Sequence, residues 1–183
     1  TGRSSEAARP FALPCMAVVG ASAKSARGSS SNLRKSSEAA MVLFVYGSLM
    51  AEEVVRILIG RVPKSMPAVL ANYARHPVAG ACFPAIVARA GASVEGRLLD
   101  GLSARDLSAL DYFEDEEYVR TEVSVVAAGE TRPCTAYVWP SDKAHLLTLD
   151  ASWSYDTFRR KDLQEYLVMT EAVRAEFEQS YPS

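Results

Sequence analysis

Several features that would assign a protein to a functional class at once are missing from this sequence of 183 residues. No apolar run is long enough to cross a bilayer, so we expect no membrane-spanning helix and no membrane partner. There is no Walker loop and no G-x-G-x-x-G pattern, so nothing indicates a nucleotide cofactor. Only two histidines are present, His76 and His145, and neither has a second ligand at i+3 or i+4. We therefore predict no metal site and no cofactor.

Cysteine is also scarce, and charge is balanced. The three cysteines, Cys15, Cys82 and Cys134, are far apart and odd in number, which disfavours a disulfide framework and fits a reducing compartment such as the cytoplasm. The sequence has 20 Lys and Arg residues and 22 Asp and Glu residues, for a formal charge of −2. This balance does not indicate binding to nucleic acid. A small molecule or another protein is left as the expected partner, and the oligomeric state is left open.

Residues 1–40 differ in composition from the rest of the chain. They are rich in Ser and Ala, hold six Lys or Arg residues and two Glu residues, and lack hydrophobic periodicity. We expect a disordered leader, either an extension before a true start at Met41 or a transit peptide. A transit peptide would change the expected location to a plastid or a mitochondrion.

From Met41 onward, the apolar pattern predicts one α+β domain over residues 41–183. VLFVY at 42–46 is a buried strand that turns at Gly47, and Ser48 is expected to cap a helix with apolar positions at Val54, Val55, Leu58 and Ile59. Further strands are predicted at 68–73, 85–88, 94–99, 118–126 and 135–139. Amphipathic spacing predicts one long helix over residues 156–179. Many short strands with few helices favour a mixed β core that closes into a small barrel.

One acid stands out in the acidic stretch LDYFEDEEYVR at 110–120. Ser103 and Asp106 form the S-x-x-D start of a helix whose buried stripe continues through Leu110 and Phe113. Glu114 follows Leu110 by four residues, so its side chain leaves the helix on or beside this apolar stripe. The next three acids belong to the following turn. A carboxylate beside an apolar wall has a raised pKa and can exchange protons near neutrality, although acidic runs are more often solvated surfaces.

An ordered set of motifs resembles a known superfamily. FVYGSLM at 44–50, VAGACFPAIV at 78–87, VEGRLLDGLS at 94–103 and LDYFEDEEYVR are similar to segments of the gamma-glutamylcyclotransferase-like superfamily. AYVWP followed by SWSYDTFRR resembles its plant avirulence-induced (AIG-like) branch. The resemblance implies a BtrG-like barrel, short helices and a long C-terminal helix.

The same resemblance implies cleavage of a gamma-glutamyl amide with release of 5-oxoproline. Glu114 matches the family's catalytic glutamate. The family's substrate loop matches Tyr46, Gly47, Ser48, Leu49, Met50 and Ala51.

Two further residues and two other functions stay open at this point. The Tyr118 hydroxyl either orients the substrate ammonium or Glu114, or only fills the barrel. Arg120, on the same strand face, is expected to neutralise the acidic cluster rather than contact substrate. The alternatives to a cyclotransferase are a non-catalytic ligand-sensing or protein-interaction module of the same fold, and an enzyme acting on a different amide.

Overall fold

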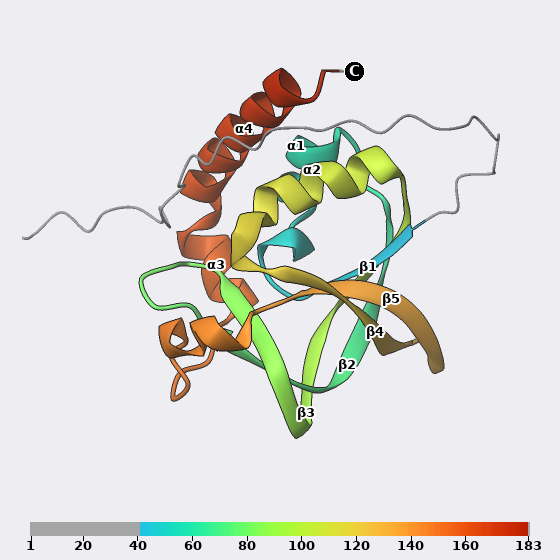
Figure 1. Ribbon diagram of the computed structural model, residues 1–183, viewed down its shortest axis with the longest axis vertical. Helices are drawn as coiled ribbons and strands as arrows, with labels where there is room; N and C mark the ends of the chain where they lie inside the picture. The colour runs from blue at the N-terminus through green and yellow to red at the C-terminus, as the bar shows by residue number, and fades with distance from the viewer. Residues whose placement is uncertain (1–40, 183) are drawn as a thin grey trace, which may run out of the picture.

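A computed structural model describes residues 41–182 and places five strands in one closed barrel. The strands follow the order β1-β3-β2-β4-β5, and all neighbours are antiparallel except β1 and β5, which close the barrel in parallel (Figure 1). The small mixed barrel predicted from the sequence is confirmed. The predicted leader at 1–40 lies outside the described residues. The strands are β1 (Met41–Val45), β2 (Lys64–Pro77), β3 (Pro84–Leu102), β4 (Val119–Ala127) and β5 (Glu130–Val138).

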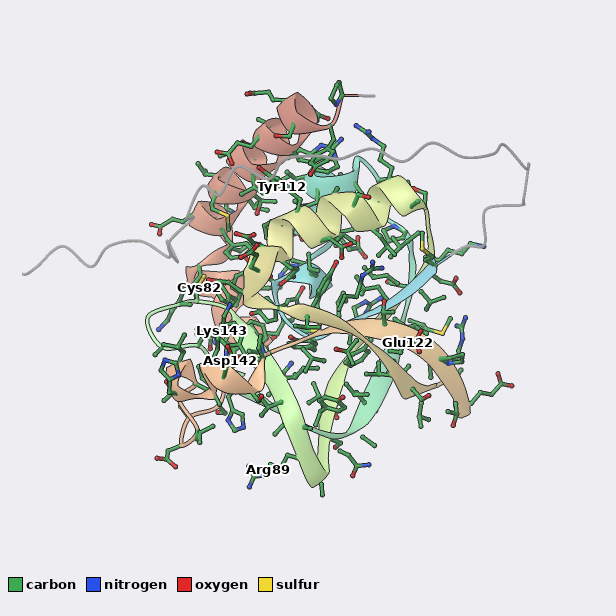
Figure 2. The ribbon with its side chains drawn as sticks, in the orientation of Figure 1. Cys82, Arg89, Tyr112, Glu122, Asp142 and Lys143 are labelled. Carbon is green, nitrogen blue, oxygen red and sulfur yellow. The ribbon has the colours of Figure 1, made fainter. Side chains whose placement is uncertain are left out.

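Two of the predicted strands are parts of one long strand. The segments 85–88 and 94–99 both lie in β3, which pairs with β2 along most of its length. The connecting residues Arg89, Ala90 and Gly91 are exposed, so this segment has no buried apolar side chain that periodicity could detect. Figure 2 shows Arg89 at the end of the barrel farthest from α1 and α2.

The helices α1, α2 and α4 lie together on one side of the barrel (Figure 1). The helices and 3₁₀ turns are η1 (Ser48–Met50), α1 (Glu52–Ile59), α2 (Ala104–Glu114), η2 (Asp115–Glu117), η3 (Ser141–Leu146), α3 (Tyr155–Lys161) and α4 (Leu163–Ser180). Among residues 41–182, no helix is long and apolar enough to cross a membrane.

The single C-terminal helix predicted over 156–179 is wrong, because the segment breaks at Asp162 into α3 and α4. Phe158 and Leu163 are both buried in the core cluster between the helices and β1. Five residues apart on one continuous helix, they would point about 140° away from each other. The break lets both side chains enter the same core.

Strand β1 separates two parts of the hydrophobic core. Leu43 and Val45 pack against the helices, whereas Phe44 and Tyr46, just beyond the strand's end, pack with residues of the barrel interior. Both faces of β1 are therefore buried, which explains why its sequence is continuously apolar rather than alternating.

The two predicted helix caps have different outcomes. Ser103 caps α2 as predicted: its Oγ accepts from the Asp106 amide at 3.1 Å, and Asp106 Oδ2 accepts from the Ser103 amide at 2.9 Å. Ser48 is not a cap, because α1 begins after Ala51 and no side chain caps it. The 3₁₀ turn η1 separates Ser48 from α1, and Tyr166 of α4 donates to the Ser48 hydroxyl instead.

Gly96 on β3 is required by close packing. A Cβ at this position would lie 2.3 Å from the Val45 carbonyl oxygen and 2.7 Å from the Phe44 ring. We expect Gly96→Ala to lower the free energy of unfolding by about 2–4 kcal/mol, because backbone has to move. Gly129→Ala is the control: its φ is +83° in open space, so only backbone strain of about 1–2 kcal/mol applies. Urea denaturation of both variants measures the difference, and equal losses would contradict this account.

Candidate active site

A cavity of about 110 Å³ lies where the end of β1, the end of α2 and the middle of α4 come together. It contains the acid and most of the turn that the sequence resemblance assigned to the substrate. The lining residues are Phe44, Val45, Tyr46, Gly47, Ser48, Leu49, Phe83, Pro84, Phe113, Glu114, Asp115, Glu117, Tyr118, Tyr137, Tyr166, Met169 and Val173.

Glu114 is the last residue of α2 and points into this cavity. The helix is held by its capping box at one end and by the buried Leu107 and Leu110 along its inner face. Asp115 then turns the chain sharply, with a φ of 49°. A non-glycine residue in this region carries backbone strain, which proteins concentrate at functional sites. The turn ends the helix with the Glu114 carboxyl directed at the cavity.

Burial raises the pKa of Glu114 from 4.5 to about 8, with smaller contributions in the same direction from the charges of Glu117 and Asp111. Among residues 41–182, no cation forms an ion pair with Glu114. The carboxyl is therefore protonated in a large fraction of molecules at neutral pH. A group with its pKa in this range can both accept and return a proton under ordinary conditions.

Four tyrosines surround this carboxyl: Tyr46, Tyr118, Tyr137 and Tyr166. Burial is the main cause of the raised pKa of each, and the Glu114 charge adds to it, so all four hydroxyls stay protonated. Each hydroxyl donates elsewhere: to the Tyr137 carbonyl at 2.6 Å, the Pro84 carbonyl at 2.9 Å, Asp111 Oδ1 at 2.8 Å and Ser48 Oγ at 2.9 Å, respectively. Glu114 thus receives no hydrogen bond from them, which leaves desolvation to dominate its pKa.

The neighbouring acids divide into two groups. Asp111 accepts from Tyr137 and forms an ion pair with Arg120 at 3.1 Å, so the prediction that Arg120 neutralises an acid of this cluster is confirmed. Asp115 and Glu117 also line the cavity. This corrects the expectation that Glu114 is separate from all three of the acids that follow it. Burial raises the pKa of Glu117 as well.

Lys143 of η3 lies close to this acidic turn. Its Nζ donates to the Glu116 carbonyl at 2.6 Å, and its charge partly offsets the raised pKa of Glu117. Figure 2 shows Lys143 beside the barrel, next to Asp142. This contact attaches η3 to η2 at the edge of the cavity.

The predicted substrate loop is only partly at the cavity. Tyr46, Gly47, Ser48 and Leu49 line it, whereas Met50 and Ala51 do not. Ala51 is fully buried in the helical core, and Met50 faces a separate charged cleft. A Cβ at Gly47 would lie 3.0 Å from the Pro84 ring, so the absence of a side chain lets the turn approach this wall closely.

Sequence reasoning did not assign Tyr137, Tyr166, Met169 and Val173 to the site. Met169 and Val173 extend the cavity wall along α4, and Tyr166 connects that helix to the turn at Ser48. Tyr166 lies within the amphipathic segment predicted over residues 156–179, and a core stripe and a cavity wall have the same spacing. No local signal in the sequence distinguishes the two.

A family model described as "Gamma-glutamyl cyclotransferase, AIG2-like" matches residues 43–156. The chain belongs to this family. Among relatives in the AIG2-like family, "AIG2-like protein D" of Arabidopsis thaliana is 34% identical over 137 residues, which cover 73% of this chain and 89% of the relative.

Solved structures agree on the fold. A solution structure from Arabidopsis thaliana is 26% identical in sequence to this protein. The aligned region covers 85% of this chain and 90% of the solved chain, with a TM-score of 0.57. A structure described as "Gamma-glutamyl cyclotransferase" is 20% identical in sequence. The aligned region covers 55% of this chain and 67% of the solved chain, with a TM-score of 0.50. At 20% identity, the similarity to this second structure establishes only the fold. The AIG2-like membership inferred from the motifs is thereby confirmed, together with the fold.

The buried carboxyl predicts a pH-dependent stability difference. Because the folded state raises the pKa of Glu114 from 4.5 to about 8, the folded state binds more protons than the unfolded state between these values. Ionisation therefore destabilises the native state as the pH rises through this window. We expect Glu114→Gln to gain stability relative to the unsubstituted protein by about 2–4 kcal/mol between pH 5 and pH 9.

Urea denaturation at pH 5, 7 and 9 measures this difference. Glu130→Gln, at the exposed first residue of β5, is the control for losing one surface carboxylate and should stay within about 0.5 kcal/mol. A difference between Glu114→Gln and the unsubstituted protein that does not change with pH would show that Glu114 is solvated.

Proposed function

We propose that this protein is a gamma-glutamyl cyclotransferase that cleaves a gamma-glutamyl amide to 5-oxoproline and a free amine or amino acid. The observation that carries the proposal is the presence of Glu114, with a pKa raised to about 8, in the same cavity as the turn at 46–49. Membership in the AIG2-like family supports the same reaction class.

The reaction needs few protein groups, because the substrate supplies its own nucleophile. The α-amine attacks the γ-carbonyl carbon and closes a five-membered ring, and the bond from that carbon to the departing nitrogen then breaks. On the way to 5-oxoproline the α-ammonium loses two protons, one before attack and one from the ring nitrogen after it, and the departing nitrogen gains two and leaves as an ammonium. Glu114 transfers these protons one at a time, accepting each in its ionised form and returning it in its protonated form. The carboxyl ends in its starting state, so the proton balance closes without a cofactor.

The cavity supports the other requirement, which is to hold the substrate folded. The amides of Met50 and Ala51 already donate to the carbonyls of Gly47 and Ser48, both at 3.0 Å. The earlier amides of the turn, at 47–49, have no such backbone acceptor among the described residues and belong to cavity-lining residues. They suit the substrate α-carboxylate or the oxyanion that develops on the carbonyl.

Loss of activity on substitution tests the role of Glu114. We expect Glu114→Gln to reduce the release of 5-oxoproline at least ~100-fold, because Gln keeps the shape of the side chain but transfers no proton. The measurement is mass-spectrometric detection of 5-oxoproline across a panel of gamma-glutamyl amines and gamma-glutamyl amino acids. Glu116→Gln removes the same charge from an exposed position that does not line the cavity and should retain activity.

Two results would reject the proposal. Undiminished turnover by Glu114→Gln would remove that residue from the mechanism. A panel with no product, combined with thermal stabilisation of the protein by a gamma-glutamyl compound, would favour the ligand-sensing module instead.

The pH profile gives a second test. Removing the Glu117 charge lowers the pKa of Glu114, because that charge raises it in the intact protein. The ionised form is the proton acceptor, so kcat/KM rises with pH through this pKa. Glu117→Gln is therefore expected to move the rising limb to lower pH by about 0.5 to 1 pH unit. Glu116→Gln is again the control, and a rising limb that moves upward or stays in place would contradict the assignment.

A further inference from the structure

The cavity depends on a helix that lies outside the part of the chain matched by the family model. That match ends at residue 156, whereas Tyr166, Met169 and Val173 come from α4. Of these three side chains, Tyr166 makes a hydrogen bond to the turn that we propose holds the substrate. Its hydroxyl donates to Ser48 Oγ at 2.9 Å across 118 residues of sequence.

Packing fixes the position of the Tyr166 ring. The ring meets Phe113 of α2 at a centroid distance of 6.0 Å and Phe158 of α3 at 5.2 Å, edge to face in both cases. Only 4% of the residue is exposed. Its hydroxyl is therefore delivered to Ser48 from a direction set by three helices rather than by a mobile side chain.

This hydrogen bond limits what the Ser48 hydroxyl can do. A serine hydroxyl has one hydrogen to donate, and its oxygen here accepts from Tyr166. Phenolic hydroxyls are more acidic than serine hydroxyls, so Tyr166 is the better donor of the pair. Among residues 41–182, no hydrogen bond takes up the Ser48 hydrogen. Ser48 is 6% exposed and lines the cavity, so its hydrogen is available to a bound molecule.

We propose that Tyr166 is a positioning residue, and that α4 is thereby part of the active site. Tyr166 holds the Ser48 hydroxyl as a donor to an oxygen of the gamma-glutamyl group. The proposal rests on the proposed function, since that function supplies the oxygen acceptor. When the acceptor binds, the chain from Tyr166 through Ser48 to the substrate oxygen runs in one direction, and each hydrogen bond strengthens the next.

A double-mutant cycle tests the connection. The four proteins are the unsubstituted chain, Tyr166→Phe, Ser48→Ala and the double variant. Each single substitution is expected to lower kcat/KM about 10-fold, which is typical for a hydrogen bond to a charged group. The double variant should be no worse than Ser48→Ala, because Tyr166 acts through that hydroxyl. Full activity of Tyr166→Phe, or a double variant whose loss is the product of the single losses, would overturn the proposal.

Tyr112→Phe is the matched control for removing a phenol hydroxyl between the same helices. Figure 2 shows Tyr112 on α2, on the side that faces α4. Its ring packs against Phe177 of α4 at a centroid distance of 5.6 Å, and it does not line the cavity. We expect it to leave kcat/KM unchanged. Melting temperatures of all variants separate loss of fold from loss of positioning.

The split between kcat and KM identifies which substrate oxygen accepts the hydrogen bond. A raised KM with unchanged kcat indicates the α-carboxylate, which is anionic throughout the reaction. A lowered kcat indicates the carbonyl oxygen, whose charge develops only in the transition state. If Tyr166 acts in packing alone, its substitution changes neither kcat nor KM once the folded fraction is corrected for.

Failure of the proposed function can be distinguished from failure of this inference. If the protein binds gamma-glutamylethylamide by calorimetry without releasing 5-oxoproline, the proposed reaction is wrong. The same cycle then applies to the binding constant, with the same non-additive result expected. If the protein neither converts nor binds that compound or any gamma-glutamyl compound of the panel, both proposals are rejected. If it is active and the two substitutions act independently, only the role of Tyr166 is rejected.

Discussion

Desolvation of one carboxyl at the end of α2 is the constraint on which the candidate site depends. Moving an unpaired carboxylate from water into an apolar cavity costs free energy, and the protein meets this cost by raising the pKa of Glu114 to about 8. The surrounding structure maintains the constraint. Asp111 is paired with Arg120 and Tyr137, and the four tyrosine hydroxyls donate away from Glu114. Any change that gave this carboxyl a hydrogen-bond donor or a cation would lower its pKa.

The site and the hydrophobic core share the same elements. Tyr46 belongs to the barrel interior and Leu49 to the helical core, yet both line the cavity. The turn between them approaches Pro84 so closely that Gly47 has no room for a side chain without displacing the proline ring. One wall of the cavity is therefore also packed core, which keeps the turn rigid and pre-organised. Substitutions in this wall affect stability and binding together.

Much of the fold could be predicted from the sequence because its signals are local. The S-x-x-D pattern at Ser103, the apolar run of β1 and the alternation along β4 each follow from neighbouring residues. Helical spacing also separated Glu114 from most of its acidic neighbours, and the family motifs added the turn at Tyr46. The role of these residues in catalysis stays a prediction.

The predictions that were wrong, and the residues that were missed, involve contacts between distant segments. Ser48 has the residue type of a helix cap, but a tyrosine 118 residues away donates to its hydroxyl. The break at Asp162 follows from the need to bury both Phe158 and Leu163, which is a demand of the tertiary core. The cavity wall on α4 has the periodicity of ordinary core packing. None of these is encoded within a window of neighbouring residues, so local patterns cannot reveal them.

The position of α4 after the other elements that line the cavity has a consequence for biosynthesis. During translation the strands, the acidic turn and Glu114 leave the ribosome before residues 163–180 do. The barrel is then able to form while the cavity is still open on the side that Tyr166, Met169 and Val173 later cover. A nascent or prematurely terminated chain would thus contain Glu114 without the part of the cavity wall on α4 that helps to raise its pKa. The raised pKa of Glu114 is therefore acquired only after α4 docks.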